Sequence, residues 1–472
     1  MRPPVNALHH GGDAASARPG AAESPRSPDR PRVALQTLGC KLNQYESDAI
    51  AAEFAEAGYR IVPFGEEAEV QVLNTCTITN RADRKSRNLL YRSLRSGAKL
   101  VVLTGCFAEH HAEEYRREPR GDGVHPGLMV VDNPRKSRIV ELVEARRQGD
   151  LVDPTALDPA LFGFRPASLR HTRAAVKIQD GCDNFCSFCI VPQVRGRAVS
   201  RPPAEVLADA EERIREGAKE IVLTGVNISR YERDDTPFSG LLERLLDLPG
   251  DFRLRISSLE PDRLDERFRA QLSHPKMTPH LHLCLQSGSD RILREMRRQY
   301  DIAQFRRMVD GIREAREDFN LSTDIIVGFP GETEEDFAAS REMVRELRFS
   351  HVHTFPYSPR SRTRAARMPE QVSNQVKSRR AAEIRRIAGE NKHGYRASLI
   401  GAQQRVLVER PDPAPEREHG YGEHYVPVRI LPPKDSPAPL LERNRFYTVT
   451  ITGMDPDDED PEKEPILQGA LR

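Results

Sequence analysis

The chain has 472 residues, of which 38% are hydrophobic and 30% are charged, and its formal net charge is +1. No apolar run approaches the roughly 20 residues that cross a membrane, so membrane-spanning proteins are excluded and we expect a cytoplasmic protein. Residues 1–31 hold Gly, Ala, Pro, Arg and Ser without an apolar run. They predict a disordered tail rather than a secretory signal.

Residues 32–145 alternate strand-like and helix-like segments. Short β-branched or aliphatic runs predict strands at 33–38, 69–73, 99–103 and 128–131, and helical periodicity follows most of them, most clearly at 46–57. This alternation is typical of a parallel α/β domain. Residues 146–172 contain Pro, Asp and Gly with little periodicity and predict a linker.

Residues 173–395 repeat the alternation six times. Strands are predicted at 174–179, 220–224, 253–257, 280–286, 323–327 and 351–355, and helices such as 301–315 and 334–347 lie between them. Six β/α units in series predict an open, partial (β/α)6 barrel of the TIM type. A basic helix at about 372–398 follows. Residues 396–472, with strand-like runs at 405–408, 425–430 and 446–451, predict a small C-terminal β-barrel.

A C-x3-C-x2-C motif, Cys182, Cys186 and Cys189, follows the first predicted strand of the barrel. Structural zinc usually has four protein ligands, whereas a [4Fe–4S] cluster held by three cysteines leaves one iron open. The spacing, with the aromatic Phe188 before the last cysteine, resembles the radical S-adenosylmethionine superfamily. A zinc knuckle with a distant fourth ligand is the alternative, but it does not explain the six β/α units that follow.

This resemblance implies that the open iron binds S-adenosylmethionine and that one-electron reduction releases a 5′-deoxyadenosyl radical. Because β/α barrels place their chemistry at the carboxyl ends of the strands, we expect residues there to bind the cofactor. Capping of the next helix is the alternative role for each polar one. The expected cofactor-binding residues are Phe188, Thr224, Gly225, Ser257, Ser258, Glu260 and Gln286.

Three more cysteines, Cys40, Cys76 and Cys106, each follow a predicted strand of the N-terminal domain. In a parallel sheet they lie at one edge, the carboxyl ends of the strands, where open α/β folds bind ligands. One buried cysteine is an ordinary core residue, but three at one edge predict a second three-cysteine [4Fe–4S] cluster. Disulfides are a poor alternative in the cytoplasm. The seventh cysteine, Cys284, is expected to be a core residue.

From about residue 32 to its end, the chain resembles the methylthiotransferase family, whose C-terminal piece is an RNA-binding TRAM domain. The motifs TLGCKLNQYE (37–46), NTCTITNRADRKSR (74–87) and LTGV (223–226), together with the stretch 177–201, resemble the MtaB-type tRNA branch. The branches that act on isopentenyladenosine in tRNA or on a ribosomal protein are the alternatives. One departure is Arg362, where the family usually has Gly.

The resemblance implies methylthiolation of C2 of N6-threonylcarbamoyladenosine at position 37 of tRNA, in the anticodon loop. It also implies two [4Fe–4S] clusters, S-adenosyl-L-methionine as methyl donor and radical source, and an electron donor such as a flavodoxin or ferredoxin. The threonylcarbamoyl group ends in a carboxylate, which needs a paired charge when buried. The candidate partners are Lys41, Arg84, Lys85, Arg195 and Arg197.

Charge is segregated along the chain. Between residues 360 and 396, eleven Lys or Arg oppose three Glu, a local excess of +8. This stretch joins the barrel to the terminal domain and would clamp a phosphate backbone; a solvated basic helix is the alternative. Arg195, Arg197 and Arg201 follow the tight cysteine motif and are expected to meet RNA. The acidic run 455–464 balances the total and predicts an exposed loop.

Overall fold

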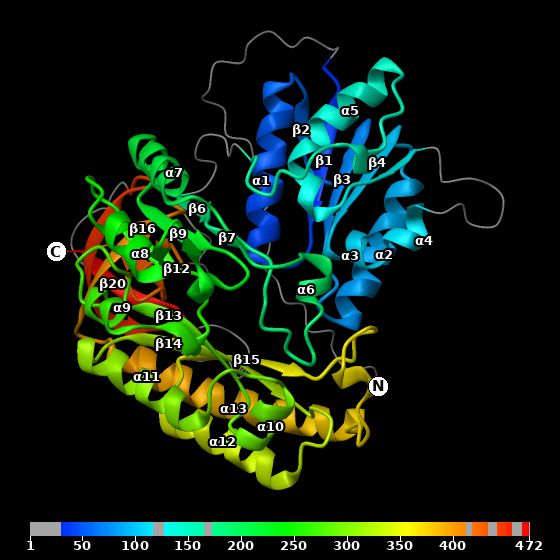
Figure 1. Ribbon diagram of the computed structural model, residues 1–472. Helices are drawn as coiled ribbons and strands as arrows, with labels where there is room; N and C mark the ends of the chain where they lie inside the picture. Colours follow the sequence, from blue (N-terminus) through cyan, green and yellow to red (C-terminus); the bar gives the residue numbers. More distant parts are fainter. Residues whose placement is uncertain are drawn as a thin grey trace.

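The computed structural model describes residues 30–116, 127–164, 172–411, 418–432, 441–455 and 465–471. Two α/β units and a closed β-barrel make up these ranges (Figure 1), which confirms the predicted fold class. The predicted tail, except for residues 30 and 31, lies outside the described residues, as do residues 456–464 of the acidic run. No described helix is both long and apolar enough to cross a membrane.

The N-terminal domain is a five-stranded parallel sheet with the strand order β2-β1-β3-β4-β5. The two central strands β3 and β4 are buried along their whole length, as expected of parallel strands covered on both faces. The order reverses between β1 and β3, and this switch point is where such sheets bind ligands. The strands are β1 (Arg32–Thr37), β2 (Arg60–Val62), β3 (Val70–Thr75), β4 (Leu100–Gly105) and β5 (Leu128–Val130); the helices are α1 (Lys41–Glu56), α2 (Asn80–Leu94), α3 (Cys106–His110), α4 (Ala112–Arg116) and α5 (Ile139–Gln148).

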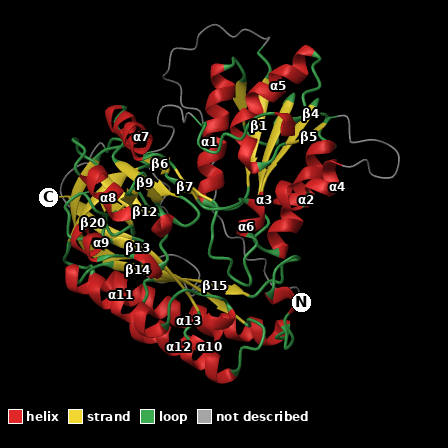
Figure 2. Ribbon diagram, viewed as in Figure 1, coloured by secondary structure: helices red, strands yellow, loops and turns green. Residues whose placement is uncertain are grey.

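The central domain is the predicted partial barrel. Its parallel strands form two groups, β6-β9-β12 and β13-β14-β15, which are joined by two isolated parallel bridges, Leu254 with Met277 and Leu259 with Leu283. Figure 2 shows the helices α11, α12 and α13 outside β13 and β14, so the strands line the interior. The strands are β6 (Arg173–Lys177), β9 (Glu220–Thr224), β12 (Arg253–Ile256), β13 (His280–Gln286), β14 (Asn320–Val327) and β15 (His351–Pro356). The helices are α6 (Val191–Val194), α7 (Pro203–Arg215), α8 (Phe238–Leu246), α9 (Glu266–Gln271), α10 (Asp290–Glu295), α11 (Ile302–Ala315), α12 (Glu334–Leu347) and α13 (Asn374–Ser398).

The C-terminal domain is a closed barrel with the order β16-β17-β18-β20-β19. It packs against the central barrel at the strand starts, because the Arg253 side chain donates to the Arg405 carbonyl at 3.1 Å and the Asn320 amide donates to the His424 carbonyl at 2.5 Å. It is therefore part of the wall of the central barrel rather than a separate appendage. The strands are β16 (Gln403–Val408), β17 (Gly420–Tyr421), β18 (Pro427–Leu431), β19 (Phe446–Met454) and β20 (Leu467–Leu471).

The segment predicted as a linker, 146–172, begins inside α5 and contains a 3-10 turn, Pro154–Ala156. Its Phe164 is buried in the core of the N-terminal domain, and the Leu161 carbonyl accepts a hydrogen bond from Lys177 at 3.0 Å. The described part of this segment thus packs against both α/β domains.

Candidate functional site

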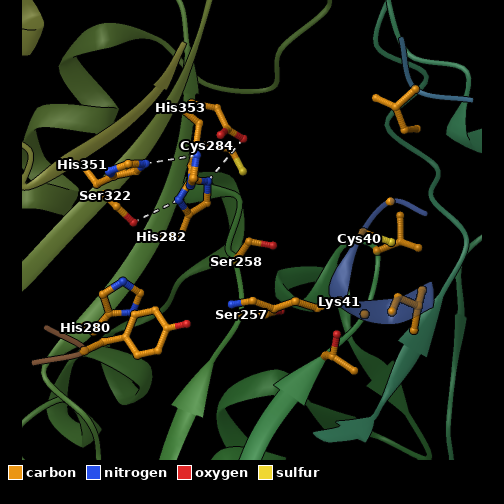
Figure 3. A pocket seen from close by; sticks show the side chains of 18 of the residues that line it. Cys40, Lys41, Ser257, Ser258, His280, His282, Cys284, Ser322, His351 and His353 are labelled. Atoms are coloured by element: carbon orange, nitrogen blue, oxygen red, sulfur yellow. Dashed lines mark hydrogen bonds and ion pairs between the residues drawn. The ribbon is translucent and has the colours of Figure 1, made fainter. Parts of the chain in front are cut away.

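A cavity of about 670 Å³ is lined by residues of all three domains (Figure 3). The N-terminal domain contributes the three dispersed cysteines at the carboxyl edge of its sheet. The central barrel contributes residues from the starts and the ends of its strands, and the terminal barrel contributes two tyrosines and Val426. The lining includes Cys40, Lys41, Cys76, Cys106, Arg195, Thr224, Gly225, Ser257, Ser258, His280, His282, Cys284, Asp324, His351, His353, Tyr421 and Tyr425.

The dispersed cysteines come from three successive connections of the N-terminal sheet. Cys40 is the N-cap of α1, Cys76 follows β3, and Cys106 opens α3. Gly39 has φ +112, and a Cβ there would lie 2.9 Å from the Cβ of Cys76. Only glycine permits this backbone without strain, so the sequence before Cys40 allows two of the cysteines to approach.

The dispersed thiols suit a metal centre better than a set of free thiols. Burial, together with the neighbouring Cys106 and Cys40, raises the pKa of the Cys76 thiol to about 12. Burial also raises the pKa of Cys106. Crowded, buried thiols do not ionise alone, but a bound metal takes up thiolate charge and removes this cost. These three residues therefore fit an iron–sulfur cluster.

A buried charge network joins the N-terminal domain to the barrel behind these cysteines. Arg195 contacts Glu46 and Asp180, each at 3.0 Å. Glu46 also pairs with Lys136, and with Lys177 at 3.2 Å. Burial alone would raise the pKa of Glu46, but Arg195, Lys136 and Lys177 hold it well below its usual range. The network surrounds one carboxylate with three cations and fixes the two domains to each other.

The expectation that Arg195 and Arg201 meet RNA is wrong. Arg195 lies in the buried network, and its charge lowers the pKa of the Cys106 thiol against the effect of burial. Arg201 is buried and bonds Asp209 at 2.7 Å. Arg197 is exposed over 72% of its side chain. Sequence spacing gives the position of such arginines but not their partners.

The tight cysteine loop lies beside the cavity, because Val191, which lines it, follows Cys189 by two residues. Gly181 precedes the loop with φ +69, and a Cβ there would lie 1.9 Å from the Arg197 carbonyl oxygen. Burial, together with Cys186 and Cys182, raises the pKa of the Cys189 thiol to about 12. The three thiols are therefore close enough to influence one another.

Two side chains that the sequence did not single out donate to the sulfurs of this loop. The Arg298 Nη1 lies 3.2 Å from the Cys186 Sγ, and the Asn227 Nδ2 lies 3.7 Å from the Cys182 Sγ. Arg298 also bonds Glu260. Donors aimed at sulfur match cluster-bound thiolates, which are acceptors. The loop therefore fits a cluster as the dispersed set does.

The expected cofactor-binding residues separate into two groups. Phe188 packs against the apolar cluster around Phe329, Glu260 pairs with Arg298, and Gln286 is buried with φ 69. None of these three residues lines the cavity. The four that line it are Thr224, Gly225, Ser257 and Ser258.

Strand β13 presents polar groups to the cavity that the sequence did not single out. His282 accepts or donates through Nδ1 to the Ser322 hydroxyl at 3.0 Å and contacts Asp324 through Nε2 at 3.2 Å. Cys284, expected in the core, is half-buried and lines the cavity beside them, so that prediction is wrong. Side chains alternate between the two faces of a strand, so His280, His282 and Cys284 share one face. This alternation could have predicted from the sequence that they lie together.

Positive charge gathers where the terminal barrel closes the cavity. Arg255 stacks on the Tyr425 ring at 4.0 Å from its centroid, and the Lys41 ammonium and the Arg173 guanidinium lie at 5.5 and 5.6 Å. Burial alone would raise the pKa of Tyr425, but these three cations lower it to about 8. We call Lys41, Arg173, Arg255, His280 and Tyr425 the cationic floor.

Lys41 is the one candidate carboxylate partner on this floor. Lys41 is exposed and lines the cavity, and desolvation by the surrounding protein, together with Arg255, lowers its pKa to about 8. Arg84 and Lys85 are exposed on α2 and do not line the cavity.

The basic stretch is partly internal. Four of its eleven cations are buried: Arg360, Lys377, Arg380 and Arg396. Arg360 bonds Asp83 of the N-terminal domain at 2.7 Å, and Arg380 bonds Glu332 at 2.6 Å. Six others are exposed: Arg362, Arg364, Arg367, Arg379, Arg385 and Arg386. Arg362 has φ 70, so it keeps the left-handed backbone that glycine adopts most easily.

Comparison with known proteins agrees with this geometry. The model of the Radical SAM superfamily matches residues 176–344, and that of Uncharacterized protein family UPF0004 matches residues 32–125. A radical S-adenosylmethionine methyltransferase, TsrM, from Kitasatospora setae shares the fold, with a TM-score of 0.51 and 16% identity over 70% of this chain and 77% of that one. That structure shows the fold alone. The match to the Radical SAM superfamily model, together with the relatives named below, defines the class: a radical S-adenosylmethionine enzyme.

Curated relatives define the family within that class. The threonylcarbamoyladenosine tRNA methylthiotransferases MtaB of Thermotoga maritima and Bacillus subtilis are 36% and 37% identical, over 80% and 84% of this chain and 86% and 89% of theirs. The tRNA-2-methylthio-N(6)-dimethylallyladenosine synthase of Cereibacter sphaeroides is 34% identical over 90% of this chain and 97% of its own. The chain belongs to the radical S-adenosylmethionine tRNA methylthiotransferases, and it is of the MtaB type.

Proposed function

We propose that this enzyme adds a methylthio group to C2 of N6-threonylcarbamoyladenosine at position 37 of tRNA. The observation that carries the proposal is the shared cavity: Cys40, Cys76 and Cys106 face the same 670 Å³ as the strand ends of the barrel. Pockets of roughly 300–1,000 Å³ hold molecules the size of a nucleoside. The names of the Thermotoga and Bacillus relatives support the choice of nucleoside.

Two [4Fe–4S] clusters form part of the proposal. Cys182, Cys186 and Cys189 would hold the first and leave one iron for S-adenosylmethionine; Cys40, Cys76 and Cys106 would hold the second. When bound, the first cluster would supply the electron, S-adenosylmethionine the methyl group, and the second cluster the site for sulfur. The donor sets support both assignments, because each contains two thiols whose pKa burial raises: Cys76 and Cys106 in the dispersed set, and Cys186 and Cys189 in the tight loop.

The protein's own residues bind, position and exclude water. Ser257 and Ser258 at the end of β12 offer hydroxyls to a polar cofactor at the cavity wall. Arg298 neutralises thiolate charge at Cys186 and is itself held by Glu260. Arg195 supplies the equivalent charge beside Cys106. The target adenine must leave its stack to enter the cavity, as bases do in enzymes that modify them.

The anticodon loop of tRNA is the proposed macromolecular partner. The exposed arginines of the basic stretch, such as Arg364 and Arg385, are suited to phosphate contacts. The proposed electron source is a flavodoxin or a ferredoxin, and the proposed compartment is the cytoplasm.

One assay tests the nucleoside. Anaerobically reconstituted enzyme receives dithionite, S-adenosylmethionine, a sulfide source and one of two anticodon stem-loops, carrying either threonylcarbamoyladenosine or isopentenyladenosine. We expect 2-methylthio product from the first and little from the second, because a site built for polar groups discriminates by orders of magnitude when they are missing. Equal or preferred use of the isopentenyl substrate overturns the proposal, and modification of neither favours a protein substrate.

A further inference from the structure

The cationic floor contains a cation without an anionic partner. Among the described residues, Arg173 pairs with Glu409 at 2.7 Å, and Arg255 pairs with Glu220 at 2.7 Å. The Lys41 ammonium has no carboxylate within ion-pair distance in the part of the chain that the structure describes. The ammonium lies 5.5 Å from the centroid of the Tyr425 ring.

Two further polar atoms on the floor lack partners. In the described structure, the buried Nη1 of Arg255 and the buried Nδ1 of His280 have no hydrogen-bond partner. His280 is 7% exposed and lines the cavity. A buried polar atom left unpaired costs free energy. Lys41 and His280 line the cavity, whereas Arg255 lies behind Tyr425. An unpaired ammonium near an unpaired imidazole nitrogen at one end of the cavity calls for an anion with hydrogen-bonding groups to complete it.

The position of Lys41 suits one end of the proposed substrate. Lys41 is the residue after Cys40, and Figure 3 shows its side chain extending from the Cys40 side of the cavity toward His280. On adenine, C2 and the N6 substituent point to opposite sides of N1. A base whose C2 faces the dispersed cysteines and the strand ends therefore directs its N6 substituent along the cavity, away from the cysteines.

We propose that Lys41 binds the carboxylate of the threonylcarbamoyl group and thereby selects this nucleoside over those with an apolar N6 substituent. The inference rests on the proposed function. Tyr425 and His280 form the remaining wall of the carboxylate site, while Arg173 and Arg255 act behind Tyr425 as positioning residues that hold its ring and add positive potential. An isopentenyl group offers the ammonium no anion, so it gains none of the charge-assisted pairing that the carboxylate gains, and this difference is the basis of the selection.

The test removes the positive charge of Lys41 by substitution and the negative charge of the substrate carboxylate by esterification. Variant Lys41→Met is compared with the native holoenzyme on stem-loops carrying threonylcarbamoyladenosine or its carboxylate methyl ester. The native enzyme should prefer the acid by about 10²-fold in kcat/KM, the effect of one charge-assisted hydrogen bond. Lys41→Met should lose activity on the acid but not on the ester, so that the ratio approaches one, and Lys41→Arg should restore the preference.

Lys99→Met is the matched control, because Lys99 precedes β4 at the opposite edge of the same sheet and is 79% exposed. It should keep the native ratio. Since Lys41 neighbours Cys40, iron content is measured for each variant, and the dissociation constants of both stem-loops are measured without reductant. These constants report the ratio even if turnover is abolished. If Lys41→Met keeps the native preference for the acid over the ester, in kcat/KM or in binding, the inference is overturned. If the native enzyme prefers isopentenyladenosine, the proposed function is overturned instead.

Discussion

The tight loop carries Cys182, Cys186 and Cys189 on eight consecutive residues, whereas Cys40, Cys76 and Cys106 reach the cavity from three separate connections of a sheet. Closing a short loop costs little conformational entropy, so the first set is organised by local sequence. The second set assembles only when β1, β3 and β4 pair in the observed order. The same enzyme therefore brings three thiols together in two ways, one set by local sequence and one set by the pairing of distant strands.

The largest expected effect breaks the local set. Replacing Cys182, Cys186 and Cys189 together by Ala should leave about one [4Fe–4S] cluster of two. It should also abolish cleavage of S-adenosylmethionine, since these three thiols hold the cluster proposed to bind that cofactor. Iron and sulfide analysis and the yield of 5′-deoxyadenosine are the measurements. Tightly bound zinc in place of iron in the native protein would contradict the assignment.

The converse variant breaks the non-local set. The triple replacement of Cys40, Cys76 and Cys106 by Ala should keep 5′-deoxyadenosine formation and abolish the methylthio product, because the sulfur site is removed while the loop is untouched. Nucleoside mass spectrometry of the treated tRNA measures it. If this variant made product at the native rate, the dispersed cysteines would not be cluster ligands.

A third variant sharpens the comparison through the buried arginine of the network. Arg195→Met leaves Glu46 and Asp180 with fewer cations, and breaking a buried pair costs about 3–5 kcal/mol. Because Arg195 lies beside Cys106, the variant should lose iron from the dispersed site before the loop. Arg201→Met, which removes a buried arginine that pairs with Asp209 outside the network around Glu46, is the control and should retain iron at both sites. Equal loss in the two variants would show that the network has no special relation to the dispersed site.

A smaller effect is expected on the affinity of the protein for tRNA. Changing Arg364, Arg367 and Arg385 to Gln should weaken tRNA binding and reduce the slope of log affinity against log salt. The reduction should be about 0.7–0.9 for each phosphate that the protein no longer neutralises. Cleavage of S-adenosylmethionine should stay at the native rate. Titrations at several salt concentrations give the slope, and an unchanged slope would assign these arginines to a solvated surface.

The smallest effect concerns backbone strain. Glycine provides the left-handed residue before each of Cys40 and Cys182, but Arg362 occupies such a conformation with a side chain. Arg362→Gly should therefore stabilise the protein by roughly 1 kcal/mol, or about 1 °C in Tm for a chain of this size. Arg364→Gly, at a residue with φ −61, should give no gain. Scanning calorimetry of both variants makes the comparison.

Local sequence predicted most of the fold. Strands β9 and β13 and helix α12 begin and end where the pattern placed them, because their alternation or periodicity is long and regular. Strands β2 and β20 were missed. The first has three residues, and the second contains Gly469, whose Cβ position would lie 2.6 Å from Val449; close packing, not strand propensity, explains that glycine.

The candidate site was predictable only in part. Cysteine spacing and strand ends identified the thiols, because those are properties of short segments. The partners Glu46, Arg298 and Tyr425 come from distant parts of the chain, and their roles depend on what packs beside them. Arg195 shows the limit most clearly, since its neighbours in sequence indicate a surface for RNA while its neighbours in space bury it.

The two tyrosines that the terminal barrel adds to the cavity wall have a consequence for biosynthesis. During synthesis from the N-terminus, all six cysteines emerge from the ribosome more than 200 residues before Tyr421 and Tyr425. The cavity that the dispersed cysteines line therefore stays without this part of its wall until the last domain has been translated and folded.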